Sequence, residues 1–162
     1  MIAIRKSTPK DYDQIWDILS QVIAGGDTIA FSPTSSKEKM LEFWCGADKH
    51  TYVAVIDGEV VGTLFIKDNQ PDLGSHIANA GYLTLPSARG KGVGLAMGKF
   101  SLVEARRLGY QAMQFNIVVK SNQGAVRLWQ KLGFKIIGEI PEAFNHMQLG
   151  MTNAYIMYRK LS

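Results

Sequence analysis

A glycine-rich, basic stretch in the middle of the chain carries the residue types of an anion-binding loop. It is Arg89-Gly90-Lys91-Gly92-Val93-Gly94, and it lies between a strand-like segment and one with apolar residues at helical spacing. Glycines let the backbone turn sharply and approach a ligand closely, and the N–H groups and dipole of a helix start favour negative charge. Arg89 and Lys91 add cationic donors. The stretch predicts a phosphate cradle, although a plain glycine-rich connection with solvated basic residues would have the same composition.

Two common phosphate motifs do not fit this loop. A Walker A loop needs Gly, four residues and then Gly-Lys-Ser/Thr, and the chain contains no such run. A dinucleotide-binding fingerprint needs a third glycine, where this chain has Met97, and an acidic residue about 20 positions later. Residues 105–125 contain neither Asp nor Glu. The loop therefore fits neither of these nucleotide-binding families.

The elements around the loop alternate between strand-like and helix-like segments. Strands are expected at residues 2–5, 51–56, 59–66, 77–85, 112–119, 134–140 and 154–161, and helices at 9–22, 37–44, from 93 to a cap at Gly109, and from 121 to Gly133. The Asp57-Gly58 pair between two of these strands is a strong hairpin signal. We write the order as βααββββαβαββ. It predicts one domain over residues 1–162 with a mixed α/β fold, a single central sheet with helices packed on its faces.

Composition narrows the class of partner. The chain has 162 residues, 18 basic and 14 acidic side chains, and a formal net charge of +4. This mild surplus suggests attraction to an anion, either a polymer or a small molecule, and the spread of the basic residues along the chain argues against nucleic acid. The one cysteine, Cys45, allows neither an internal disulfide nor a cysteine-based zinc site, so we expect no metal and a reducing cytoplasm. No apolar run reaches 18 residues and the start has no signal-peptide pattern, so we expect no membrane partner.

Two blocks of the sequence resemble the GNAT superfamily of acyl-CoA-dependent N-acetyltransferases. The first family block is Arg or Gln, two residues, Gly, one residue, and Gly or Ala, which residues 89–94 match directly after the strand 80–86. The second is an Asn after a strand and a helix that ends in Leu-Gly-Phe, matched by Asn122 and by Leu132-Gly133-Phe134. Their separation is normal for the family. The resemblance covers nearly the whole chain and implies a mostly antiparallel sheet with a splayed pair of strands around acetyl-CoA, the expected cosubstrate.

The resemblance implies roles for the matched positions. The pyrophosphate of coenzyme A would be held beside Arg89 by the N–H groups of Gly90, Lys91, Gly92, Val93, Gly94 and Leu95. The backbone of Leu83 and Leu85 would pair with the pantetheine arm as an added strand does, and Asn122 would contact the same arm. The helix around Ala125 and Trp129 would form a wall at the thiol end.

Shorter stretches are similar to the acetyltransferases of azetidine-2-carboxylate and related proline analogues, and to phosphinothricin-type enzymes. They include Gly26-Asp27-Thr28, Asn79-Ala80-Gly81-Tyr82 and Gln114-Phe115-Asn116. In the first group, asparagines at the positions that match Asn79 and Asn116 bind the substrate. Neutral amides can hydrogen-bond a carboxylate or carbonyl without repelling an amine. The alternative is that both side chains merely satisfy strand ends or water.

The sequence assigns no catalytic acid or base. Many family members place a Tyr before the Leu-Gly-Phe block as general acid, and this chain has Trp129 there, which has no phenolic proton. The strand at 77–85 carries no Asp or Glu to act as base. A free thiol has a pKa near 8.5, so the thiolate is a tolerable leaving group without a strong acid. The three histidines, which lack metal-ligand spacing and are expected to be surface or satisfied groups, are His50, His76 and His146.

These observations predict an N-acetyltransferase that moves acetyl from acetyl-CoA to a small amine, an amino acid or an analogue, by direct attack in a ternary complex. Two alternatives stay open. Acetylation of a protein N-terminus or lysine would favour an open, acidic groove. A non-catalytic acyl-CoA-binding regulatory module would explain the missing Tyr. The final strand, residues 155–161, would suit a homodimer interface.

Overall fold

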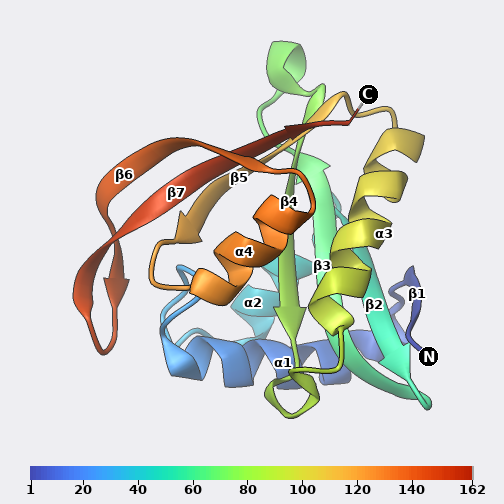
Figure 1. Ribbon diagram of the computed structural model, residues 1–162. Helices are drawn as coiled ribbons and strands as arrows, with labels where there is room; N and C mark the ends of the chain where they lie inside the picture. Colours follow the sequence, from blue (N-terminus) through green and yellow to red (C-terminus); the bar gives the residue numbers. More distant parts are fainter. Residues whose placement is uncertain (162) are drawn as a thin grey trace.

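The computed structural model describes residues 1–161 and confirms the alternating order of elements (Figure 1). In chain order they are β1 (Ala3–Lys6), α1 (Tyr12–Gly25), α2 (Lys37–Trp44), β2 (His50–Ile56), β3 (Glu59–Asp68), β4 (Ile77–Thr84), α3 (Val93–Arg107), β5 (Ala112–Val119), α4 (Gln123–Lys131), β6 (Lys135–His146) and β7 (Gly150–Lys160). Three strands separate α2 from α3, whereas the predicted string had four. The polar stretch between β3 and β4 forms a short 3₁₀ turn at Asp72–Gly74, so no residues remain for another strand.

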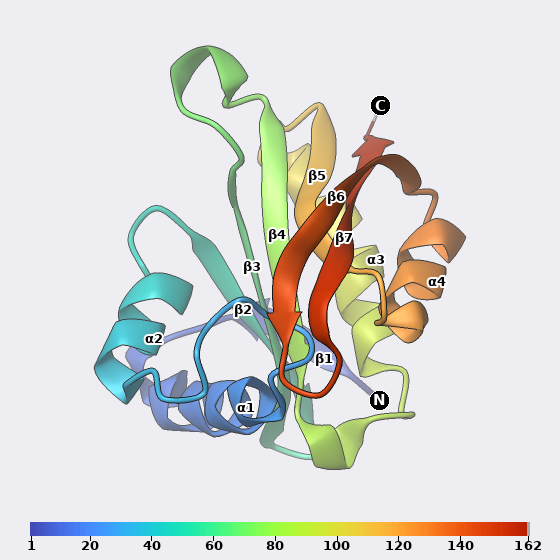
Figure 2. The same ribbon diagram turned by 90° about the vertical axis from the view of Figure 1, so that its left-hand side faces the viewer.

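The strands form one sheet in the order β1-β2-β3-β4-β5-β7-β6. Neighbours are antiparallel except β4 and β5, which run parallel. Helices α1 and α2 cover one face of the sheet and α3 and α4 the other, while the β6–β7 hairpin bends away from the remaining strands (Figures 1 and 2). The predicted mixed α/β fold with a mostly antiparallel sheet is therefore confirmed. Within residues 1–161, no helix has both the length and the apolar character needed to cross a bilayer.

Each face of the sheet has its own apolar core. On the α1 side, Ile15, Ile18 and Leu19 are fully buried against strand residues. On the α3 side, Met97 and Met113 are fully buried within a second cluster. Apolar burial on both faces is the main stabilising contribution to such a layered fold. The two cores hold the sheet rigidly between the helices, so the strand ends near the glycine-rich loop have fixed positions.

Strands β4 and β5 are neighbours along only a short part of their length. Their pairing consists of Ile77 with Ala112 and Ala78 with Met113, although both strands continue for six more residues. Beyond this point β5 contains a bulge, between Phe115 and Val118, in its pairing with β7. A bulge bends a strand away from its neighbour. The sheet therefore opens between β4 and β5, as the predicted splayed pair of strands requires.

An ion pair holds the start of helix α1 in place, and a glycine at its end sets the direction in which the chain continues. Arg5 makes a two-pronged ion pair with the buried Asp11, at 2.8 and 2.9 Å, and this pairing is the main reason why the pKa of the Asp11 carboxyl is lowered. The helix ends at Gly26, whose φ of +61° is the left-handed conformation that glycine adopts most readily. The chain leaves α1 toward the open end of β4, where it forms the α1–α2 loop, residues 26–36.

Candidate active site

Two adjoining cavities occupy the opening between β4 and β5. The smaller, of about 250 Å³, lies between the separated strands and is lined by Asn79, Asn116, Ala125 and Trp129 among others. The larger, of about 610 Å³, runs from Arg89 and the start of α4 to the α1–α2 loop and the tip of the β6–β7 hairpin. Thr28, Tyr82 and Asn122 line both. The two cavities together form a continuous cleft across the sheet.

The glycine-rich loop has the backbone conformation that the sequence suggested. Gly90 and Gly92 have φ values of +81° and +80°, and a Cβ at either position would meet nothing within 4 Å. Gly92 caps α3 without a side chain, and the first turn of the helix contains no acidic residue. Ala96 N–H is the first to find a helical partner, on the Gly92 carbonyl, so the N–H groups before it are free for a ligand. These residues fit a pyrophosphate group.

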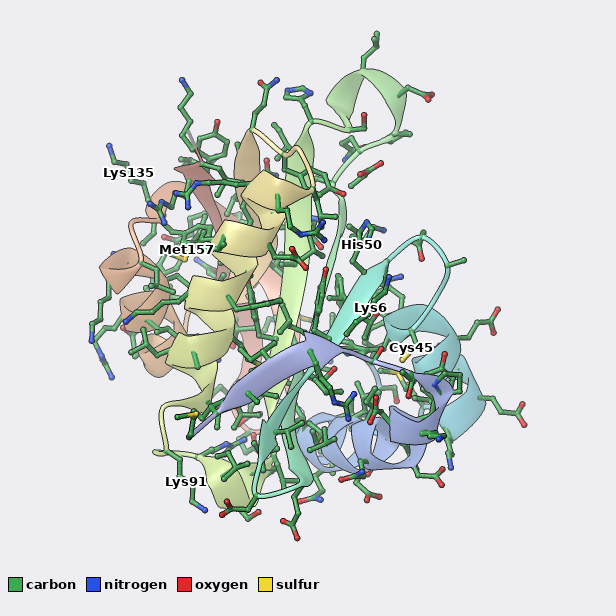
Figure 3. The ribbon with its side chains drawn as sticks, turned by 90° about the vertical axis from the view of Figure 1, so that its right-hand side faces the viewer. Lys6, Cys45, His50, Lys91, Lys135 and Met157 are labelled. Atoms are coloured by element: carbon green, nitrogen blue, oxygen red, sulfur yellow. The ribbon has the colours of Figure 1, made fainter. Side chains whose placement is uncertain are left out.

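The two basic residues of the loop differ in position. Both side chains are exposed, but Arg89 is among the residues that line the larger cavity. Lys91 lines neither cavity of the cleft, and Figure 3 shows it at the edge of the molecule. Of the two, Arg89 is the cation that borders the cleft.

The backbone of β4 differs from the prediction by one residue. Leu85 N–H donates to the Val61 carbonyl at 2.8 Å, and the Leu85 carbonyl closes the following 3₁₀ turn, also at 2.8 Å. Backbone groups of an antiparallel strand face its two sides alternately, so those of Leu83 also face β3. The prediction that Leu83 and Leu85 present their backbone to a ligand arm is therefore wrong. Tyr82 and Thr84 present theirs on the side from which β5 has separated.

The start of α4 forms the wall between the two cavities. Asn122 caps this helix, and its Oδ1 accepts a hydrogen bond from Ala125 N–H at 3.3 Å. Trp129 is buried to all but 7% and packs on Tyr82 with 4.6 Å between ring centroids. Gly98 of α3 allows this arrangement, because a Cβ there would lie 2.5 Å from Leu132 and 3.2 Å from Trp129. The sequence pattern did not identify this role of Gly98.

The two candidate asparagines both lie in the smaller cavity, at the point where the strands separate. Asn79 Nδ2 donates to the Gln114 carbonyl at 3.0 Å across the gap from β4 to β5. Asn116 is exposed, belongs to the bulge of β5, and its Oδ1 accepts from Gln114 Nε2 at 3.2 Å. Each amide thus has one group bound within the protein. The other group of each amide has no hydrogen bond within residues 1–161, so Asn79 Oδ1 can accept a hydrogen bond from a ligand and Asn116 Nδ2 can donate one.

The tyrosine of the cleft cannot take the place of the missing general acid. The Tyr82 hydroxyl shares a 2.7 Å hydrogen bond with Ser101 Oγ on α3 and donates to Met113 Sδ at 3.4 Å. Burial of the hydroxyl raises the pKa of this phenol above its ordinary value. The hydroxyl therefore lies under α3, away from the space between the strands. The ring, not the hydroxyl, is what Tyr82 contributes to the cleft.

The larger cavity is also lined by Asp27, which the sequence comparison included in the stretch Gly26-Asp27-Thr28 without a role, and by His146, which sequence reasoning did not identify. Asp27 is the only carboxylate among the residues that line the two cavities. His146 lies at the end of β6, and its Nδ1 accepts from the N–H groups of Gln148 and Leu149, both at 3.1 Å. The two residues are 119 positions apart in the chain, and no local motif connects them. Only their position in the fold brings them together.

The remaining features to place are the cysteine and the possible metal ligands. Cys45 follows α2 and lines neither cavity of the cleft, and burial raises the pKa of its thiol to about 11. A thiol with that pKa is protonated at neutral pH and is a poor nucleophile. Among residues 1–161, no three His, Cys, Asp or Glu side chains come together as ligands for a metal ion.

Comparison with known proteins places this cleft in a family. A model of the acetyltransferase (GNAT) family matches residues 14–134. The structure of a GCN5-related N-acetyltransferase from Kribbella flavida superposes with a TM-score of 0.93 and 36% sequence identity, over 98% of this chain and 97% of that one. The N-acetyltransferase aca1 of Schizosaccharomyces pombe is 39% identical over 84 residues, which are 52% of this chain and only 40% of that protein.

Two of the similar solved structures contain acetyl-CoA. A phosphinothricin acetyltransferase from Sinorhizobium meliloti, in complex with acetyl-CoA, superposes with a TM-score of 0.87 over 99% of this chain and 89% of that one. Its sequence identity is 20%, so the likeness is one of fold. The extent of the family match and the 36% identity to the Kribbella protein lead to one conclusion: the chain belongs to the acetyltransferase (GNAT) family.

Proposed function

We propose that this protein transfers acetyl from acetyl-CoA to the amine of a small molecule, an amino acid or an amino-acid analogue, within a ternary complex. The observation that carries the proposal is the cleft between β4 and β5, with a free helix start beside Arg89 at one end and two neutral amides, Asn79 and Asn116, in its middle. Acetyl-CoA supplies the activated acyl group. The proposal treats residues 1–162 as one catalytic domain.

The coenzyme half of the cleft comprises residues 89–95 and the start of α4. Free N–H groups at residues 90–95 and the Arg89 guanidinium suit a pyrophosphate. The open backbone groups of Tyr82 and Thr84 suit an extended amide-bearing arm, which would add to β4 as a strand does. Ala125 and Trp129 give this arm an apolar wall. Every group in this half matches a feature of coenzyme A.

The acceptor half offers polar groups of both kinds to an amine. Asn79 Oδ1 can accept from the attacking amine, and Asn116 Nδ2 can donate to an oxygen of the same molecule. When the amine nitrogen attacks, the new C–N bond replaces the C–S bond and the nitrogen loses a proton. Asp27 is the carboxylate nearest to this role, since it is the only one that lines the cleft. The thiolate leaves without an acid from Trp129 or Tyr82, consistent with the moderate pKa of a thiol.

The experiment is thiol release from acetyl-CoA with a panel of amino acids, bare amines and peptides. We expect release with amino acids or their analogues and none without an acceptor. Release with peptides alone would instead indicate a protein N-terminal or lysine acetyltransferase. Binding of acetyl-CoA without turnover on any acceptor would indicate a regulatory module.

A further inference from the structure

Two residues that line the larger cavity, and to which the proposed function gives no role, carry hydrogen-bond donors. The first is His146, which is 9% exposed and lines this cavity from the tip of the β6–β7 hairpin. Its Nδ1 accepts two backbone N–H groups, from Gln148 and Leu149. A neutral imidazole that accepts at Nδ1 carries its proton on Nε2. The opposite edge of the ring is therefore an N–H donor, and within residues 1–161 the hydrogen bonds of this side chain are the two at Nδ1.

The second donor is the Thr28 hydroxyl. Its Oγ1 is buried and makes no hydrogen bond within the described residues 1–161, and Thr28 lines both cavities of the cleft. A buried hydroxyl without a partner costs about 1–3 kcal/mol relative to a satisfied one, so such groups usually have a ligand or water as partner. Because Thr28 lines both cavities, a ligand in the cleft is a candidate for this missing partner.

The segments that carry the two donors are joined directly. Met147 N–H donates to the Gly26 carbonyl at 3.1 Å, which attaches the hairpin tip to the α1–α2 loop. A Cβ on Gly26 would collide with the Met147 side chain, so a glycine at position 26 is what leaves room for this side chain. Thr28 and His146 each lie within two residues of this contact. Their donors are thus held in a fixed arrangement before any ligand binds.

The chemistry of the donors defines their ligand. An N–H fixed by its tautomer can only donate, so the ligand must present lone pairs there, and a second ammonium group would be repelled. A carboxylate has two oxygens and can accept from both donors, and charge makes such bonds shorter and stronger. Asp27, adjacent to Thr28, provides the only negative charge that lines the cavity and suits the ammonium group of the same molecule.

We propose that His146 Nε2–H and the Thr28 hydroxyl bind the carboxylate of the acceptor, which makes the protein selective for amino acids over the corresponding simple amines. This inference rests on the proposed function and names the group that decides its substrate class. It gives the β6–β7 hairpin a direct part in acceptor recognition, in addition to the contacts that the proposed function assigns to Asn79 and Asn116.

The test uses matched acceptors and matched variants. The acceptors are azetidine-2-carboxylate with azetidine, proline with pyrrolidine, and alanine with ethylamine, each pair differing only in the carboxylate. His146→Asn keeps an acceptor near the place of Nδ1 and removes the outer N–H, whereas His146→Gln restores an N–H near the place of Nε2. Thr28→Val removes the hydroxyl at constant shape, and Thr28→Ser keeps it.

We expect His146→Asn and Thr28→Val each to lower kcat/KM for the carboxylated acceptors about tenfold, as the loss of one charge-assisted hydrogen bond implies. The bare amines and the KM for acetyl-CoA should change by less than about twofold, and the Gln and Ser variants should recover most of the loss. Equal losses on both members of a pair, or no loss, would overturn the inference while leaving the proposed function intact. A wild-type protein that acetylates none of these acceptors would overturn both.

Discussion

The two halves of the cleft are built in different ways. The proposed coenzyme half is largely a continuous run of chain, residues 89–95, in which each feature follows from its neighbours: the positive φ of Gly92, the free first turn of α3, and Arg89 beside it. The proposed acceptor half adds to the two asparagines residues of two distant segments, Asp27 and Thr28 of the α1–α2 loop and His146 of the β6–β7 hairpin, and one backbone hydrogen bond joins these segments. A continuous site can be identified as a motif, whereas an assembled one becomes visible only in the fold.

The largest expected effect is in the coenzyme half. Gly92→Asp places a carboxylate and a strained φ where the pyrophosphate would lie, so binding of acetyl-CoA should be lost, by more than about 100-fold in Kd. Isothermal titration with acetyl-CoA measures it. Gly58→Asp is the matched control, because Gly58 has a φ of +81° and open space around it but lies in the β2–β3 turn. Equal affinity in both variants would remove the loop from the coenzyme site.

The second largest effect is expected on the acceptor KM, when the contact between Gly26 of the α1–α2 loop and Met147 of the β6–β7 hairpin is disturbed. Gly26→Ala forces a Cβ into Met147 at a φ of +61°, which should detach the hairpin from the α1–α2 loop. We expect the acceptor KM to rise about tenfold, since a displacement of about 1 Å can cost far more than one hydrogen bond, with little change in the KM for acetyl-CoA. Steady-state kinetics in which each substrate is varied in turn give the acceptor KM and the acetyl-CoA KM separately. A rise in the coenzyme KM alone would mean that the two halves of the cleft are not independent.

A smaller effect is expected from one amide of the central cavity. Asn116→Ala removes the free Nδ2 without touching the ladder, because Asn116 lies in the bulge of β5. The acceptor KM should rise by about three- to tenfold, the value of one neutral hydrogen bond, and acetyl-CoA affinity should stay nearly constant. Gln114→Ala is the control for loss of the Gln114–Asn116 contact itself. An unchanged acceptor KM in the Asn116 variant would exclude this side chain from the site.

The smallest effect is expected at Tyr82, whose ring lines both cavities and whose hydroxyl lies outside the cleft. Tyr82→Phe removes a buried hydroxyl bonded to Ser101, so urea unfolding should show a loss of about 1 kcal/mol in stability. Because the raised pKa keeps this phenol protonated throughout the working range, the pH profile of kcat should keep its shape. Loss of the alkaline or acidic limb in the variant would assign the hydroxyl a catalytic role that its position under α3 contradicts.

Much of the fold followed from local patterns. The apolar stripe of α1, the Asp57-Gly58 turn and the alternation along β5 each predict an element that the structure contains. The side of β4 that Leu83 and Leu85 face could not be read in this way, because the direction of backbone groups depends on the pairing with Val61 and Thr63. His146 was missed for a related reason: its tautomer is fixed by two N–H groups of its own hairpin. Both the pairing of a strand and the tautomer of a histidine depend on which backbone groups lie opposite them in the fold, and residue types alone do not specify this.

The short pairing of β4 with β5 has a consequence for how the protein responds to its substrate. Two residue pairs hold the two parts of the sheet together at one end, and the amides of Tyr82 and Thr84 have no strand beside them. In solution these amides should exchange with deuterium quickly for buried strand positions, and slowly once acetyl-CoA fills the gap. Binding would then complete the sheet. The substrate should raise the melting temperature by mass action, and it should protect most the amides nearest the opening.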